Sequence, residues 1–128
     1  MKKLIFSLIY CLCFGVIVQA QCDNNITLNS QVEVDAFNVN YSCSIIEGDL
    51  VINNTNVSNL DSLINIQEIT GNLVIYNNDS LLSFDGLGKL KTIGGNFSIG
   101  FNSLITDFDD LESLTDIGGN IAIQANAS

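Results

Sequence analysis

The sequence predicts a mainly β solenoid of stacked coils, each about 24 residues long, that follows a short N-terminal helix. Three observations predict it: a Gly-(Asn/Asp)-apolar pattern recurs four times, apolar residues recur at every third position between the copies, and an asparagine follows each copy. A unit of this length cannot bury both sides of its apolar layer. Neighbouring units must therefore stack, with their strands paired in parallel into a sheet.

Residues 1–20 have the features of a cleavable signal peptide. Lys2 and Lys3 precede an apolar run over 4–18, and Val18-Gln19-Ala20 has the form of a cleavage site, so cleavage is expected after Ala20. A membrane anchor is the competing interpretation, but the run of 15 residues is shorter than the roughly 20 that span a bilayer. We expect export without membrane insertion after cleavage, to a bacterial cell envelope or the extracellular space, because the segment is short and begins Met-Lys-Lys.

Residues 21–47 are predicted to form an N-terminal cap on the first coil. Ile26-Thr27-Leu28 is typical of a short strand, and the Ser-x-x-Glu form of Ser30 to Glu33 predicts a capping box that opens a helix through about Phe37. Such an element would cover the apolar layer of the first coil.

Two of the four cysteines, Cys22 and Cys43, remain after cleavage of the signal peptide. In an oxidising compartment, two cysteines most simply form one disulfide. A metal pair or a redox pair is the alternative, but the 20 intervening residues and the lack of histidine argue against both. We expect a structural bridge within the cap.

Residues 48–128 are predicted to form the repeat solenoid, with coils at 48–71, 72–95 and 96–119 and a truncated coil at 120–128. Apolar residues three positions apart match from coil to coil and are predicted to fill the core. A strict period of three drifts against the helical 3.6 and favours a tight, partly 3₁₀ path. The three matching sets are Val57, Leu60, Leu63, Ile66, Ile69; Leu81, Phe84, Leu87, Leu90, Ile93; and Ile105, Phe108, Leu111, Leu114, Ile117.

Each strand is expected to alternate, with Leu73 and Ile75 facing the core and Asn72, Val74 and Tyr76 facing outward. The glycine before each strand is expected to lie at a sharp corner. It would permit either a positive φ or the close approach of a neighbouring chain segment there. The asparagines that recur after the strands are expected to bond to backbone groups of the turns and to stack as a ladder. These are Asn54, Asn78, Asn102 and Asn126.

The charge balance excludes one class of partner. After residue 20, 14 acidic residues stand against Lys89 and Lys91, a formal charge of −12, with no arginine or histidine. Binding duplex nucleic acid requires basic side chains to neutralise phosphates, so we expect no nucleic-acid partner.

These features together carry a family resemblance. Cys22, the helix over 31–37, Cys43 and the repeated Ile-x-Gly-Asn-Leu-x-Ile and Leu-x-x-Leu-x-x-Ile spacings resemble the receptor L domain over about residues 22–126. This leucine-rich-repeat-like module occurs in insulin and epidermal growth factor receptor ectodomains and in bacterial and fungal surface proteins. The resemblance implies a right-handed parallel β-helix that serves as a binding scaffold, without specifying the ligand.

The fourth coil departs from this pattern because its apolar ladder is missing after Asn126. Terminal repeats normally carry an atypical, polar outer face. We therefore expect that the chain is a fragment, or that a partner or a second copy covers this end by self-association.

No catalytic set of residues is predicted, and neither a cofactor nor a metal site is expected. Without histidine, Ser-His-Asp and Cys-His arrangements cannot form. The densest acidic cluster, over 107–116, is interpreted as a solvated surface, with calcium binding and paired carboxylates for polysaccharide cleavage as weaker alternatives. The sequence thus favours a protein that is not an enzyme.

The candidate ligand-binding residues are the outward strand positions Val51, Val74, Tyr76 and Ser98. Tyr76 is the expected anchor because tyrosine is favoured at binding surfaces, although scattered exposed apolar residues are also normal. The main hypothesis is a secreted or cell-surface binding or adhesion module for a protein or glycan. A structural spacer or surface-layer element of a longer protein is the alternative, and a polysaccharide-acting β-helix enzyme is the third.

Overall fold

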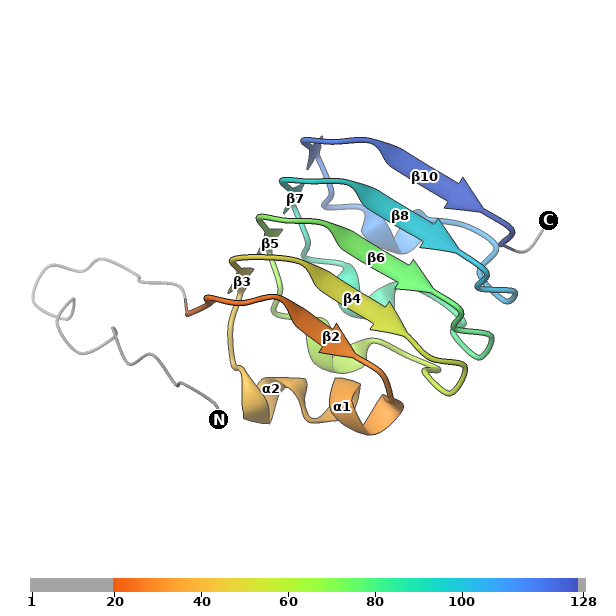
Figure 1. Cartoon of the computed structure of the whole chain (residues 1–128), viewed down its shortest axis with the longest axis horizontal. Helices are drawn as coiled ribbons and strands as arrows, with labels where there is room; N and C mark the ends of the chain where they lie inside the picture. The colour runs from red at the N-terminus through yellow and green to blue at the C-terminus, as the bar shows by residue number, and fades with distance from the viewer. Residues whose placement is uncertain (1–19, 127–128) are drawn as a thin grey trace, which may run out of the picture.

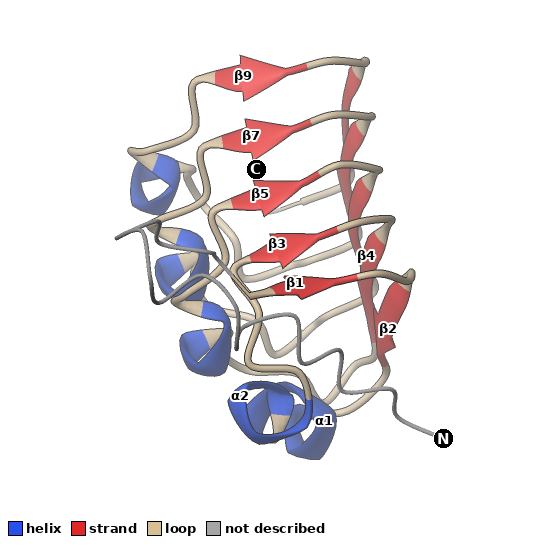
Figure 2. Cartoon of the chain, turned by 90° about the vertical axis from the view of Figure 1, so that its left-hand side faces the viewer, coloured by secondary structure: helices blue, strands red, loops and turns tan. Residues whose placement is uncertain are grey.

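The structure, a computed structural model, describes residues 20–126. All of the predicted signal peptide except Ala20 lies outside these residues. Two five-stranded parallel sheets form the fold, in the orders β2-β4-β6-β8-β10 and β1-β3-β5-β7-β9, and the strands of each sheet lie one above the other along the stack (Figures 1 and 2). The predicted mainly β architecture is therefore confirmed. The handedness implied by the resemblance and the exact coil boundaries stay predictions.

The first sheet, here called the long-strand sheet, contains all four predicted Gly-(Asn/Asp)-apolar strands and the predicted strand at Ile26. Its strands are β2 (Ile26–Leu28), β4 (Leu50–Asn53), β6 (Leu73–Tyr76), β8 (Phe97–Gly100) and β10 (Ile121–Gln124). Leu73 is aligned with Leu50 on one side and with Phe97 on the other. The predicted alternation holds, because Leu73 and Ile75 are fully buried whereas Val74 and Tyr76 are only half-buried.

The second sheet, here called the short-strand sheet, was not predicted. Its strands are only two residues long: β1 (Gln21–Cys22), β3 (Ile45–Ile46), β5 (Glu68–Ile69), β7 (Thr92–Ile93) and β9 (Asp116–Ile117). Ile69 and Ile93 were assigned to the three-residue apolar ladder and do point into the core, where both are fully buried. A two-residue strand is too short to show the alternation by which strands are found in a sequence.

The three-residue apolar period forms a 3₁₀ path, as predicted. Each coil contains one 3₁₀ turn, at η2 (Asp61–Leu63), η3 (Asp85–Leu87) and η4 (Asp109–Leu111). The turns stack on one another along one side of the molecule (Figure 2). All five apolar residues of each of the first two matching sets are buried, whereas Phe108, Leu114 and Ile117 of the third set are only partly buried.

The N-terminal segment forms two short helices, α1 (Gln31–Asp35) and α2 (Phe37–Asn40), at the end of the stack where β2 lies (Figure 1). Ser30 is the N-cap, and its side chain accepts a hydrogen bond from the Glu33 backbone N–H at 3.2 Å. Glu33 Oε2 accepts from the N–H of Asn29, one residue before the N-cap, at 2.6 Å, so the first bond of the predicted capping box is present and the reciprocal bond is displaced by one residue. The helical path continues beyond the expected end at Phe37, because a second short helix begins there.

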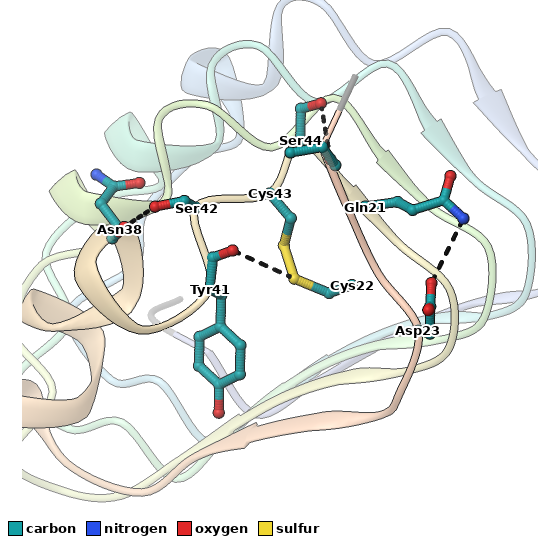
Figure 3. The surroundings of a disulfide bond; sticks show 9 residues. Gln21, Cys22, Asp23, Asn38, Tyr41, Ser42, Cys43 and Ser44 are labelled. Carbon is teal, nitrogen blue, oxygen red and sulfur yellow. Dashed lines mark hydrogen bonds between the residues drawn. A yellow bond between two sulfur atoms is a disulfide. The ribbon is translucent and has the colours of Figure 1, made fainter. Parts of the chain in front are cut away.

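The predicted disulfide is present between Cys22 and Cys43 (Figure 3). It ties β1, the first strand of the short-strand sheet, to the segment that leaves α2. Within this helical segment, the Phe37 and Tyr41 rings pack against each other, with centroids 5.1 Å apart. The bridge thus joins the helical segment to the stack.

The asparagine ladder also forms as predicted. Asn78 and Asn102 are fully buried, and each accepts a hydrogen bond from the backbone N–H of the ladder asparagine one coil earlier, at 3.0 and 3.1 Å. Their Nδ2 groups donate to the carbonyls of Ile52 and Ile75, at 3.1 and 2.9 Å. The ladder therefore satisfies backbone groups that a buried turn would otherwise leave unpaired.

The corner glycines mainly permit close packing of neighbouring coils. A Cβ on Gly71 would lie 2.6 Å from the carbonyl oxygen of Gly48, so no side chain fits between these two coils. Gly48 alone among the corner glycines has positive φ, at 149°. Of the two expected reasons for glycine, close approach thus explains most corners.

No helix of residues 20–126 is long and apolar enough to cross a membrane.

Two inward residues of β10, Ile121 and Ile123, are 58% and 54% exposed, unlike their counterparts in β8.

Candidate functional site

The outward side chains of the long-strand sheet form one continuous surface, here called the sheet face. It comprises Thr27, Val51, Asn53, Val74, Tyr76, Ser98, Gly100, Ala122 and Gln124. The strand register aligns Val51 with Val74 and Val74 with Ser98, so three of the four predicted ligand-binding residues form one column. Tyr76 lies in the neighbouring column, aligned with Asn53 and Gly100.

The ring of Tyr76 lies over the backbone of the next strand. A Cβ added to Gly100 would lie 2.5 Å from Tyr76 Cε1, so the ring occupies the space that a side chain at position 100 would fill. Gly100 itself is buried. This packing orients Tyr76 across the sheet and leaves the ring half-exposed.

Phe101 extends this aromatic surface and was missed by the sequence analysis. Its ring centroid lies 6.0 Å from that of Tyr76, with the rings inclined at 47°, and the residue is 48% exposed. Tilted pairs at this separation are favourable because the edge of one ring meets the face of the other. Tyr76 and Phe101, here called the aromatic pair, form an apolar feature at the rim of the sheet face.

Phe101 has a backbone conformation that bulky residues rarely adopt. Its φ is +56°, as is that of Asn77, which follows β6 as Phe101 follows β8. Asparagine tolerates this left-handed conformation, whereas a phenylalanine there costs on the order of 1–3 kcal/mol. Ala125, which follows β10, also has positive φ, so the left-handed corner repeats along the stack, and at Phe101 it carries an exposed aromatic side chain.

Amide groups border the aromatic pair. Asn77 Nδ2 donates to Asn53 Oδ1 at 3.1 Å, and both residues are exposed. Asn77 follows Tyr76 directly, so hydrogen-bonding groups lie next to the rings. An apolar surface with adjacent neutral donors and acceptors can contact a ligand by both packing and hydrogen bonds.

The strand residues of the sheet face include no charged side chain, although 14 acidic residues are present in the chain. The position just before β4 is Asp49, whose Oδ1 accepts from the Asn72 N–H at 2.6 Å. Other acidic side chains lie on other parts of the coils: Asp61, Asp85 and Asp109 begin the three 3₁₀ turns and are exposed. Depletion of charge is a property of the central parts of protein interfaces. The molecule therefore has a solvent-exposed acidic side at the 3₁₀ turns and a strand surface without charged residues.

The acidic cluster over 107–116 is dispersed in the structure. Asp110 Oδ2 accepts a hydrogen bond from the Phe84 N–H at 2.9 Å, and Asp107 Oδ1 accepts from the Asp109 N–H at 3.2 Å. Within residues 20–126, no three acidic or cysteine side chains are grouped as a metal ion would require. Asp110 therefore connects its coil to the preceding one, whereas Asp107 serves its own turn.

A separate open cleft of about 460 Å³ lies beside the disulfide. It is polar, and none of its residues belongs to the sheet face. Its lining residues are Ala20, Asn38, Ser42, Cys43, Ser44, Asn65, Gln67 and Lys89.

The family model that matches the chain is that of the receptor L domain, over residues 42–128. No curated protein and no solved structure matches the chain. The family match covers all the coils and more than half of the sequence, and it agrees with the two stacked parallel sheets. The chain belongs to the receptor L domain family.

Proposed function

We propose that this protein is an exported, non-catalytic module that binds a protein or glycan ligand, in recognition or adhesion, at the surface of a bacterial cell or outside it. Receptor L domains are ligand-binding modules of receptor ectodomains, which supports a binding role. The observation that carries the proposal is the sheet face, a neutral surface with an exposed aromatic pair on a chain of formal charge −12 after residue 20.

Two features support the extracellular location. The pattern of residues 1–20 is typical of a signal peptide, and the Cys22–Cys43 disulfide is stable in oxidising compartments. Both would be unusual in a cytoplasmic protein.

The ligand contacts the aromatic pair and the column of Val51, Val74 and Ser98. Aromatic residues provide much contact area at low entropic cost, and a few of them dominate most binding surfaces. The strain at Phe101 is consistent with this role, because a side chain that costs stability is retained where it contributes to binding.

A binding screen tests the proposal. The exported chain is applied to a glycan array and used as bait in pull-downs from the surface fraction of cells. Any ligand found is then titrated against Tyr76→Ala and Phe101→Asn, with Val39→Ala as the matched control, because Val39 is an 84% exposed apolar residue on α2. We expect at least a tenfold loss of affinity for each of the first two variants and no change for the third. Equal affinities for all three would contradict binding at the aromatic pair.

The second candidate is a structural spacer or surface-layer element of a longer protein. The stacked coils favour it, because each repeat contacts mainly its neighbours and such arrays extend readily. A spacer needs no ligand, so a specific, saturable ligand in the binding screen would exclude it as the sole function.

A further inference from the structure

We propose that the ligand of the sheet face is a neutral glycan, which packs a sugar ring on the aromatic pair and bonds its hydroxyl groups to the amides of Asn53, Asn77 and Gln124. This inference rests on the proposed binding function and names the class of ligand for that same surface.

Four residues that are aligned across the long-strand sheet form a row, here called the platform row. They are Asn53, Tyr76, Gly100 and Gln124, on β4, β6, β8 and β10, which lie side by side in Figure 1. Neighbouring strands are about 4.8 Å apart, so the three steps of the row span roughly 14 Å, the length of a short oligosaccharide. Gly100 has no side chain, and the Tyr76 ring occupies its space. The row therefore places an aromatic ring between two exposed amides.

The polar side chains of the sheet face are all neutral groups. Amides and hydroxyl groups donate and accept hydrogen bonds, whereas carboxylates only accept and ammonium groups only donate. Sugar hydroxyls also donate and accept, so they match such groups in either direction. The neutral polar residues are Thr27, Asn53, Tyr76, Ser98 and Gln124, five of the nine strand residues of the sheet face.

Two amides beside the aromatic pair are arranged to bond a ligand together. Asn77 Nδ2 donates to Asn53 Oδ1 at 3.1 Å, and both residues are exposed. Within residues 20–126, Asn53 Nδ2 and Asn77 Oδ1 form no hydrogen bond, so the pair offers one donor and one acceptor to a ligand. The C–H groups on the faces of a sugar ring pack on the adjacent aromatic rings, because the faces of these rings are electron-rich.

The charge of the molecule selects a neutral glycan rather than an acidic one. The formal charge of −12 after residue 20 repels polyanions. Asp79, three residues after Tyr76, is exposed and adds a negative charge close to the platform row in sequence. The two lysines after residue 20, Lys89 and Lys91, lie just before β7 of the short-strand sheet and do not belong to the row.

The size of the surface favours a glycan over a protein. A stable protein interface involves about 20–30 residues on each side, whereas the sheet face has nine strand residues. A short glycan needs only an aromatic ring and a few hydrogen-bonding groups. Both are present in the platform row.

The test is calorimetric titration of the exported chain with linear hexasaccharides. The neutral probes are hexamers of glucose, mannose, galactose and xylose, and hexagalacturonate is the acidic probe. We expect saturable binding of at least one neutral hexamer and none of hexagalacturonate. Binding of the acidic probe alone would overturn the inference.

Variants then locate the binding site of the neutral hexamer. Tyr76→Ala and Asn53→Ala are each expected to weaken binding about tenfold, since each removes a central contact. Tyr76→Phe keeps the ring and should retain most of the affinity. The matched control is Asn65→Ala, because Asn65 is an exposed asparagine before β5 of the short-strand sheet. Equal affinities of all four variants would overturn binding at the platform row.

The two proposals fail in different ways. A protein ligand in the pull-down, without binding of any neutral hexamer, would overturn the glycan class and leave the binding function intact. No ligand in either screen would overturn both. Circular dichroism of each variant separates a loss of binding from a loss of folding, and Asn53→Ala, which changes only an exposed side chain, keeps the test decisive if Tyr76→Ala does not fold.

Discussion

The two sheets of the stack are built alike on the inside and differently on the outside. Both direct fully buried residues into one core, such as Ile75 from the long-strand sheet and Ile69 from the short-strand sheet. Outward, the aligned positions of the short-strand sheet include the charged residues Glu68 and Asp116, whereas the sheet face has none.

This difference shows which constraint acts on each surface. The inward residues are set by packing, which is the same for both sheets. The outward residues of the short-strand sheet need only be compatible with water. The sheet face lacks charged strand residues in so acidic a chain, and the proposed ligand binding would account for this difference.

The largest expected effect on stability tests whether the two sheets share one core. Ile75→Ala and Ile69→Ala each remove a fully buried side chain from the shared core, so each should lower the free energy of unfolding by about 2–5 kcal/mol. Denaturant unfolding of the two variants measures this loss. A large loss for one variant and almost none for the other would show that the two sheets do not share one core.

The next largest effect on stability concerns the disulfide that holds β1, the first strand of the short-strand sheet. Replacing Cys22 and Cys43 together by alanine opens a loop with a sequence separation of 21 and should cost about 3 kcal/mol in the chain-entropy model. The loss should appear in chemical unfolding under non-reducing conditions. Under reducing conditions the wild type and the double variant should unfold alike, and a persistent difference would mean that the cysteines contribute mainly through packing.

The corner that follows the long-strand sheet supplies the third test. Asn102→Ala removes the acceptor of the Asn78 N–H and the donor to the Ile75 carbonyl, and should cost about 2 kcal/mol because these groups are buried. Asn77→Gly is the matched control, since it keeps the left-handed corner and removes only the exposed bond to Asn53. Similar melting temperatures for both variants would argue against a structural role of the ladder.

Most of the fold could be predicted because each coil repeats the same physical constraints. The alternation at Leu73 and Ile75, the three-residue apolar period and the buried asparagines recur in register, so each copy supports the others. The two-residue strands escaped prediction because their hydrogen bonds come from stacking rather than from a local pattern. The end of the helix at Phe37 was placed too early because no glycine or proline marks it.

The candidate site was predicted only in part. The alternation identified Val51, Val74, Tyr76 and Ser98 as outward residues, and their alignment follows from the register. Phe101 was missed because its exposure depends on a left-handed corner. Aligning Phe101 with Asn77 would have revealed a bulky residue in an asparagine position.

The smallest expected change in stability tests the difference between the outward surfaces of the two sheets. Val74→Lys and Thr92→Lys each place a charge at a half-buried outward position, on the sheet face and on the short-strand sheet respectively. Each should lower stability by about 1 kcal/mol or less, because a lysine stem can cover apolar surface while its ammonium group stays in water.

Binding should distinguish these two variants, since a charge in the middle of a neutral interface is desolvated without a partner. Titration with a ligand from the binding screen should show at least a tenfold loss of affinity for Val74→Lys and no change for Thr92→Lys. The reverse result would assign binding to the short-strand sheet. Equal losses would mean that net charge, which both variants change by the same amount, controls the affinity rather than the neutrality of one face.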